Sequence, residues 1–224
     1  TTWTQLQPTT VPPHRWGHAM VFHAARGTIV LHGGTAGNDT WEWNGTDWVA
    51  IPTANAPPAR TRPGAAYDYL RDRIVLWGGS VGGAAASDTW EFNGTDWSQI
   101  TTMNAPSGRR ASDMAFDPNT GGLLLFSGYQ QGADTWLFDN VDWRQLTPAT
   151  TPPQRYDHTM INDLLRGRVV MFGGNSLGDT WEWDGVDWIQ RFPTTSPPAR
   201  YDDYLVWDDI RQRVVMFGGL QGNP

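Results

Sequence analysis

Cysteine is absent from the 224 residues of this sequence, which excludes disulfide bonds and thiolate metal sites. Acidic residues outnumber basic ones: the chain has 23 Asp and Glu and 16 Lys and Arg, which gives a net charge of −7. A nucleic-acid partner needs a basic face that displaces counterions, so this balance argues against one. Long apolar runs are lacking too: the longest, such as residues 168–172, fall far short of the ~20 residues of a membrane helix. We therefore predict neither a nucleic acid nor a membrane as partner.

Tryptophan, glycine and proline are abundant, with 14, 25 and 16 residues. This mixture is typical of many short strands joined by tight turns, with large aromatic side chains packed between sheets. No signal peptide is present, and the chain begins at Thr1 and not at Met. We therefore expect a mature or excised product that is extracellular or secreted.

One pattern recurs five times along the chain: a Trp is followed twelve residues later by an Arg, just after a Pro-rich bend. The pairs are Trp3 and Arg15, Trp48 and Arg60, Trp97 and Arg109, Trp143 and Arg155, and Trp188 and Arg200. Recurrence at a fixed offset predicts a tandem-repeat fold, in which each unit is one supersecondary motif that packs on its neighbours.

Each unit carries the patterns of four short strands, A to D. Strand A follows the Arg, and strand B is an apolar run that ends in glycine, as in residues 169–174. Strand C alternates aromatic and polar residues, as in Asp-Thr-Trp-Glu-Trp at 39–43, and a hairpin such as Asn44-Gly45 leads into strand D with the next Trp. One such sheet cannot bury two aromatic faces alone, whereas sheets packed radially around an axis can.

The order of glycine pair, spaced aromatics and then Trp resembles the kelch repeat, and the resemblance covers nearly the whole chain. It implies an all-β fold: a kelch-like β-propeller of about five four-stranded antiparallel blades, with an N-terminal strand that closes the last blade. We expect a single domain over residues 1–224, with units that start at Trp3, Trp48, Trp97, Trp143 and Trp188. Kelch propellers include adaptors, lectin-like binders and a few enzymes, so the resemblance is specific for fold and not for function.

The fifth unit is one strand short. Strands A and B occur five times, and so does strand D if residues 3–6 are counted, but strand C occurs only four times. Three interpretations are open. The chain is a fragment of a longer propeller, an intact five-bladed ring with a short last sheet, or a ring whose open last blade accepts a strand donated by another chain.

Positions that differ between units are the candidates for recognition. The segment directly after each Arg is variable, and strand A is innermost in a propeller, so these segments should converge at one mouth of the central channel. The candidate ligand-binding residues are Trp16, His18, Arg62, Arg110, Asp113, Tyr156, Asp157, His158, Tyr201, Asp202 and Asp203. Aromatic rings beside carboxylates suit sugars, through stacking and hydrogen bonds; the competing interpretation is an ordinary solvated rim.

The recurring residues are expected to be structural. We predict that the five Arg side chains pin the loops by hydrogen bonds to carbonyls or carboxylates, and that the Trp side chains of strands C and D pack between blades. His18, His158, Asp157, Asp202 and Asp203 have the chemistry of metal ligands, but no spacing motif supports a site. We therefore predict neither a metal nor a cofactor.

Three classes of function follow from these patterns. We favour a non-catalytic binding module that recognises a protein segment or a glycan at the channel mouth or on the loops, because no catalytic motif is present. The alternative is a sugar-modifying enzyme similar to epimerases of this fold, in which Arg62, Asp113, Asp157, His158 and Asp202 would act as acid–base residues in the channel. The third is a fragment or an engineered repeat protein with a purely structural role.

Overall fold

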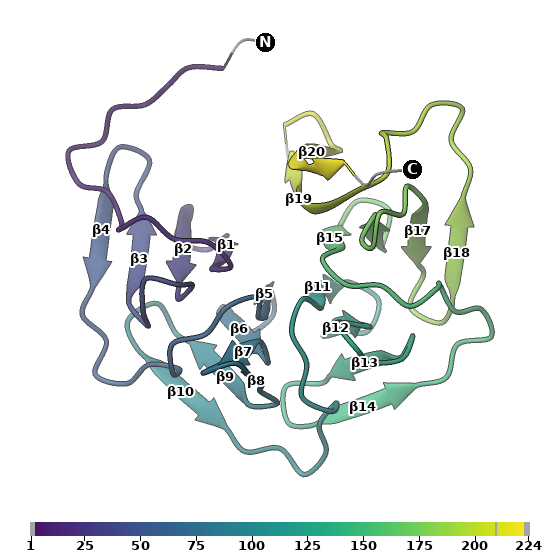
Figure 1. Ribbon diagram of the computed structural model, residues 1–224, viewed down its shortest axis with the longest axis horizontal. Helices are drawn as coiled ribbons and strands as arrows, with labels where there is room; N and C mark the ends of the chain where they lie inside the picture. The colour runs from purple at the N-terminus through teal and green to yellow at the C-terminus, as the bar shows by residue number, and fades with distance from the viewer. Residues whose placement is uncertain (1–2, 209, 222–224) are drawn as a thin grey trace.

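The computed structural model describes residues 3–208 and 210–221, and every regular element within them is a β-strand. Four four-stranded antiparallel sheets and one larger two-stranded hairpin stand around a central axis, each forming or beginning one blade (Figure 1). This radial arrangement of sheets is that of a β-propeller. The predicted all-β propeller is therefore confirmed, with four complete blades.

The complete blades share one strand order, A-B-C-D, as predicted. Blade one contains β1 (Ala19–His23), β2 (Thr28–His32), β3 (Thr40–Trp43) and β4 (Trp48–Ile51). Blade two contains β5 (Gly64–Asp68), β6 (Arg73–Trp77), β9 (Thr89–Phe92) and β10 (Trp97–Ile100), with a small hairpin, β7 (Ser80–Val81) and β8 (Ala84–Ala85), between β6 and β9. Blade three contains β11 (Asp113–Asp117), β12 (Gly122–Phe126), β13 (Thr135–Phe138) and β14 (Trp143–Leu146). Blade four contains β15 (Thr159–Asp163), β16 (Arg168–Phe172), β17 (Thr180–Trp183) and β18 (Trp188–Arg191). The fifth unit contains β19 (Arg200–Asp208) and β20 (Arg213–Gln221).

Strand B forms the centre of each complete blade. In β12, residues 123–126 are 0% exposed, because strands A and C pair along both of its edges and neighbouring blades cover both of its faces. Aliphatic and aromatic residues suit such a strand, since every side chain is removed from water.

The Trp at the start of strand D connects its blade to the preceding blade. Trp97 of blade two donates from Nε1 to Thr40 Oγ1 of blade one at 2.9 Å. The equivalent bonds run from Trp143 to Thr89 at 2.9 Å and from Trp188 to Thr135 at 3.0 Å. A buried indole needs a partner for its N–H, and strand C of the preceding blade supplies one. The predicted packing role of these Trp residues is confirmed.

The Arg after each Pro-rich bend ties the segments of its blade together. Arg60 donates to Gly78 O at 2.8 Å and to both carboxylate oxygens of Asp88 at 2.7 Å, and Trp90 Nε1 donates to the same carboxylate at 2.6 Å. Although burial raises the pKa of Asp88, the bonds from Arg60 and Trp90 hold it below its ordinary value. The equivalent ion pairs are Arg15–Asp39, Arg109–Asp134 and Arg155–Asp179. The predicted structural role of these Arg residues is confirmed.

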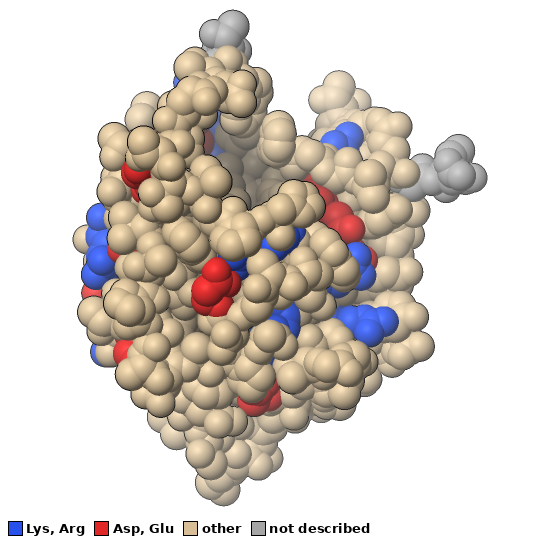
Figure 2. Space-filling view, turned by 60° about the vertical axis from the view of Figure 1, so that its left-hand side comes forward, with Lys and Arg blue, Asp and Glu red and all other residues tan. Residues whose placement is uncertain are grey.

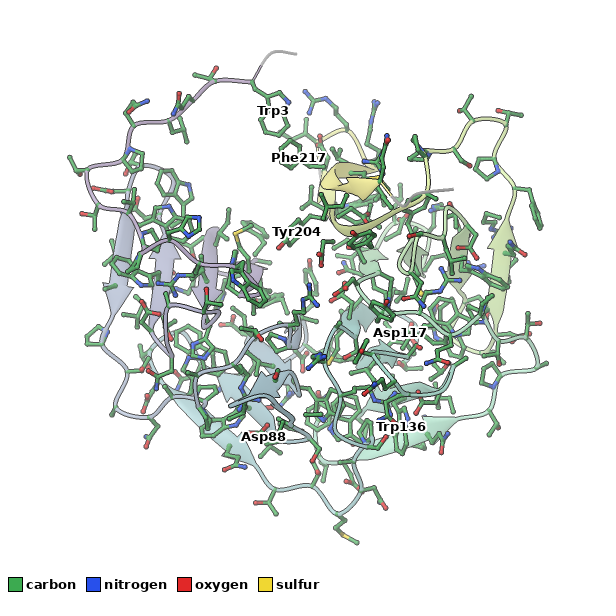
Figure 3. The ribbon with its side chains drawn as sticks, viewed as in Figure 1. Trp3, Asp88, Asp117, Trp136, Tyr204 and Phe217 are labelled. Carbon is green, nitrogen blue, oxygen red and sulfur yellow. The ribbon has the colours of Figure 1, made fainter. Side chains whose placement is uncertain are left out.

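The fifth unit is a hairpin, in which β19 and β20 pair from Arg200↔Gln221 to Asp208↔Arg213. Residues 3–8 belong to no strand, so the predicted N-terminal strand that closes the last blade is not confirmed. Trp3 is 85% exposed, and its ring lies 5.0 Å from the ring of Phe217 on β20 (Figure 3). Within the described chain, β19 packs on β15 but makes no contact with β1, and the ring stays open between these two strands (Figure 1).

Replacing Arg155 by Gln should lower the free energy of unfolding by about 3 kcal/mol, because the partly buried Asp179 carboxylate loses its ion pair and keeps only the bond from Trp181, and the Gly173 carbonyl loses its bond from the guanidinium. Urea denaturation at pH 7 measures this loss. Arg200→Gln is the matched control: Arg200 occupies the same position in the fifth unit but has no carboxylate partner among the described residues, so its loss should stay below about 1 kcal/mol. Equal losses in the two variants would contradict the role of the ion pair.

Candidate functional site

A chain of backbone hydrogen bonds links the five units around the axis. The second residue after each Arg has a left-handed backbone, with φ of +65° at Gly17, +53° at Arg62, +58° at Ala111, +53° at Asp157 and +56° at Asp202. From Arg62 onward, the N–H of each of these residues donates to the carbonyl of the one before it, at 2.7 to 3.0 Å. A non-glycine residue in this conformation costs about 1 kcal/mol or more, and such strain clusters at ligand sites. The strained segments therefore mark one end of the channel as a candidate site.

A cavity of about 730 Å³ opens at these segments, and strands β1, β5, β11, β15 and β19 all contribute to its wall. The surface is visibly hollowed between the two ends of the ring (Figure 2). Eight of the eleven predicted ligand-binding residues line the cavity: Trp16, His18, Arg62, Asp113, Asp157, His158, Asp202 and Asp203. The structure therefore brings most of the candidate residues together in one hollow of a size that suits a ligand.

The other three candidates, Arg110, Tyr156 and Tyr201, do not line this cavity. Arg110 lies over the ring of Tyr129 at 4.5 Å, and the ring of Tyr156 meets the edge of Tyr129 at 5.1 Å. Tyr201 pairs with Leu220 in the β19–β20 hairpin. Sequence reasoning missed Tyr129, because it lies in the variable loop after strand B, where no repeat pattern marks it.

Arg62 is the basic group at the centre of the site. Its Nε lies 3.6 Å from Asp157 Oδ1, and its Nη2 lies 3.6 Å from Asp202 Oδ2. These separations exceed hydrogen-bond distance, so each pair is an ion pair and not a tight charge-assisted bond. The guanidinium also lies 5.8 Å from the ring centre of Trp16, which it partly covers. Arg62 thus bridges two carboxylates and an aromatic ring at the mouth.

Three carboxyl groups of the cavity have raised pKa values. Burial raises the pKa of Asp113 to about 7, although the backbone N–H groups of Met160 and Met114 donate to it. Burial and the nearby charge of Asp202 raise the pKa of Asp157 to about 6. Burial also raises the pKa of Asp203 to about 6. These groups titrate near neutral pH, so the charge of the cavity changes in that range.

The two candidate histidines are neutral parts of the wall. Burial lowers the pKa of His158 to about 3, and its ring meets the edge of Phe126 at 5.9 Å. Burial, with the charge of Arg15, also lowers the pKa of His18. Neither histidine carries a positive charge at pH 7, and both contribute mainly packing surface.

An apolar wall of the cavity was not among the predicted site residues. Met20 and Phe22 on β1, and Tyr204 and Val206 on β19, line the cavity and remain about half exposed. Tyr204 points from β19 toward the interior of the ring (Figure 3). These side chains lie on the two strands between which the ring is open, so no neighbouring blade covers them. In the sequence, the alternation of Met20 and Phe22 indicates that both side chains point to one face of the strand, but the same alternation is equally typical of residues in a buried core.

Taken with the fold, this cavity makes the chain a β-propeller with a central hollow that is the candidate binding site. The family model described as the KLHDC2/KLHL20/DRC7 Kelch-repeats domain matches residues 1–174. The chain belongs to this kelch-repeat family, whose propellers are typically protein-interaction modules and are generally non-catalytic. No curated protein matches the chain.

Among residues 3–208 and 210–221, no group of three or more His, Asp or Glu side chains is arranged to hold a metal ion. The same residues contain no helix that is long and apolar enough to cross a membrane.

Replacing Asp157 by Asn should change how stability depends on pH. The pKa of Asp157 is raised in the folded protein, so its contribution to stability is fully present below about pH 4 and is lost as the pH rises through about 6. Asn does not ionise. The free energy of unfolding of the variant, relative to wild type, should therefore rise by about 1 to 2 kcal/mol between pH 5 and pH 7.5 in urea denaturation.

Asp142→Asn is the control, because Asp142 lies just before strand D, outside the cavity, and its pKa is lowered by the backbone N–H of Asn104. Its effect on stability should be the same at the two pH values. A pH-independent difference for Asp157→Asn would contradict the raised pKa.

Proposed function

We propose that this chain is a non-catalytic interaction module that binds an extended segment of a partner protein in its central cavity. The observation that carries the proposal is the cavity itself, to which all five units contribute and which combines charged groups with an exposed apolar wall. Pockets of this kind bind ligands through apolar contact and use a few polar groups to fix orientation. The family supports a protein as the ligand.

The charges of the cavity favour a basic side chain on the partner. Asp113, Asp157, Asp202 and Asp203 line the cavity, and Arg62 balances only part of their charge. Its two ion pairs are long, so a Lys or Arg of a partner can approach Asp157 and Asp202 without breaking a tight hydrogen bond. The desolvated setting strengthens such a pair relative to one on the surface.

The apolar wall favours hydrophobic side chains next to that basic residue. Met20, Phe22, Tyr204 and Val206 present partly exposed apolar surface to the same cavity. Burying this surface stabilises a complex by about 25 cal/mol for each Å² removed from water, before the costs of association are subtracted. A segment with alternating basic and apolar residues thus fits both features.

A sugar-modifying enzyme is the second candidate, and the raised pKa values of Asp113 and Asp157 are the observation that favours it. Carboxyl groups that titrate near pH 6 to 7 suit acid–base catalysis. Against this candidate, Asp113 already accepts bonds from two backbone N–H groups, and Arg62 covers part of the Trp16 ring that a sugar would stack on. We therefore favour the protein segment over a glycan as ligand.

We also propose that the open side of the ring is closed by further strands. The contact of Trp3 with Phe217 supports a role for the N-terminal segment there, since Trp residues at the same repeat position pack on the neighbouring blade. Among the described residues β20 pairs only with β19, and this supports the proposed addition of a strand from another chain, because exposed strand edges pair readily with extended segments.

The cavity proposal is tested with an array of 12-residue peptides that contain or lack basic residues, beside a glycan array. We expect peptides with Arg or Lys among apolar residues to bind. The double variant Asp157→Asn, Asp202→Asn should weaken that binding at least about 10-fold, because both carboxylates of the pair are removed. Binding should also weaken from pH 7.5 to pH 5, since Asp157 becomes protonated near pH 6.

Asp142→Asn makes the same kind of charge change outside the cavity and should leave binding unchanged. Peptide binding that survives the double variant would place the site elsewhere. Binding to glycans alone, or turnover of a bound sugar, would favour the second candidate.

A further inference from the structure

A second hollow lies on blade three, on the hairpin of its two outer strands, β13 and β14. Its volume is about 480 Å³, and its wall also includes Asn104 and Ala105, on the segment that leads from β10 into the blade. Among the described residues, none lines both this outer hollow and the central cavity. Blades two and three are both complete, so the outer hollow does not depend on the open side of the ring. It is a separate candidate for a ligand site.

Trp136 gives the outer hollow a rigid aromatic wall. Its indole Nε1 donates to Asp134 Oδ2 at 2.7 Å, and Asp134 is in turn fixed by its ion pair with Arg109. The ring packs on the core between blades two and three but is only partly buried, and it lies toward the outside of the blade (Figure 3). Because its N–H is already bonded, the ring offers a ligand its π face.

Gln145 lies beside this ring. It is the cross-strand partner of Trp136 in the β13–β14 pair, so both side chains point to the same face of the blade. Its side chain is exposed and forms no hydrogen bond within residues 3–208 and 210–221. A primary amide has both N–H donors and an oxygen acceptor, so Gln145 can pair with either role of a hydroxyl group.

Two further acceptors belong to the same hollow. Asn104 donates to the carboxylate of Asp142 from its backbone N at 2.8 Å and from Nδ2 at 2.6 Å, and this clamp leaves Asn104 Oδ1 unused. Asp139 accepts the backbone N–H groups of Val141 and Asp142 through Oδ1 alone, so its Oδ2 is also unused. The bonds that shape the hollow therefore leave acceptors for a ligand.

The chemistry of these groups selects among ligands. Asp139 and Asp142 disfavour a phosphate or carboxylate ligand by like charge. Arg144 also lines the hollow, but it alternates with Gln145 along β14, so its side chain points to the opposite face of the strand. An aromatic face beside separate donors and acceptors matches a neutral sugar, whose C–H groups pack on a ring while its hydroxyl groups form hydrogen bonds.

Blade two shows which group distinguishes blade three. It has the same cross-strand pair, Trp90 and Gln99, and the same clamp of an Asn on an Asp. Where blade three has Asp139, however, blade two has Asn93, whose Oδ1 accepts the equivalent backbone N–H groups. The hairpin therefore forms with either residue, but only Asp139 leaves a free carboxylate oxygen.

We propose that the outer hollow of blade three binds a neutral sugar, which stacks on Trp136 and forms hydrogen bonds with Gln145, Asn104 and Asp139. This site is independent of the peptide-binding function proposed for the central cavity. A shallow site with one aromatic ring covers only part of a monosaccharide, so its Kd should be about 1 to 10 mM.

Saturation-transfer-difference NMR tests the proposal, with the methyl glycosides of glucose, galactose and mannose as neutral probes and glucuronate as the charged one. We expect transfer to the ring C–H protons of at least one neutral sugar, and less to glucuronate. Gln145→Ala and Asp139→Asn should each weaken binding at least about 3-fold, because each removes one hydrogen bond. Gln145 is exposed, and Asn93 already serves in the hairpin of blade two, so both variants should fold.

Gln190→Ala and Asp184→Asn are the matched controls, because they make the same changes in blade four, where Trp181 is only 6% exposed. They should leave sugar binding unchanged. Absence of transfer to every neutral sugar would overturn the proposal, as would equal losses in blades three and four. Sugar binding that disappears in the double variant Asp157→Asn, Asp202→Asn would place the sugar in the central cavity instead. Peptide binding by the cavity should survive Gln145→Ala, so the two proposals fail separately.

Discussion

The ion pair between a buried Arg and the Asp that begins strand C is the interaction on which each blade depends. A guanidinium removed from water requires a carboxylate and carbonyl acceptors, and Arg60, Arg109 and Arg155 find both within their own blade. The pair joins the Pro-rich bend, the end of strand B and the start of strand C, which are far apart in sequence. The carboxylate of this Asp also accepts a hydrogen bond from the indole N–H of the Trp in strand C, which extends the connection toward the rim of the blade.

The candidate site begins next to these Arg residues. The residue two positions after each Arg has a left-handed backbone in all five units, including the fifth, where Arg200 binds only carbonyl groups among the described residues. The backbone bonds between successive units then place Arg62, Asp157 and Asp202 beside one another. Burial, together with the nearby charge of Asp202, raises the pKa of Asp157. The backbone bonds between successive units thus bring the charged groups of the shared cavity together.

Within the described residues, the fifth unit consists of strands A and B alone. There Arg200 keeps its carbonyl partners without a carboxylate, β20 pairs only with β19, and Phe217 is exposed where the equivalent Phe172 is buried. β1 at the other end of the ring likewise exposes Met20 and Phe22. The open side therefore supplies the apolar wall of the cavity.

The sequence by itself determined the blade. The period of the Trp and Arg residues, the apolar run before glycine and the Asn-Gly or Asp-Gly hairpins are local signals, and the strands, their order and the structural roles of Arg and Trp all followed from them. Only the tertiary structure decided which variable side chains share the cavity. Arg110, Tyr156 and Tyr201 lie outside the cavity, whereas Met20 and Tyr204 line it. Which side chains face the cavity depends on how neighbouring blades pack and on where the ring is open. Packing between distant segments leaves no periodic mark in the sequence, so it had to be seen in three dimensions.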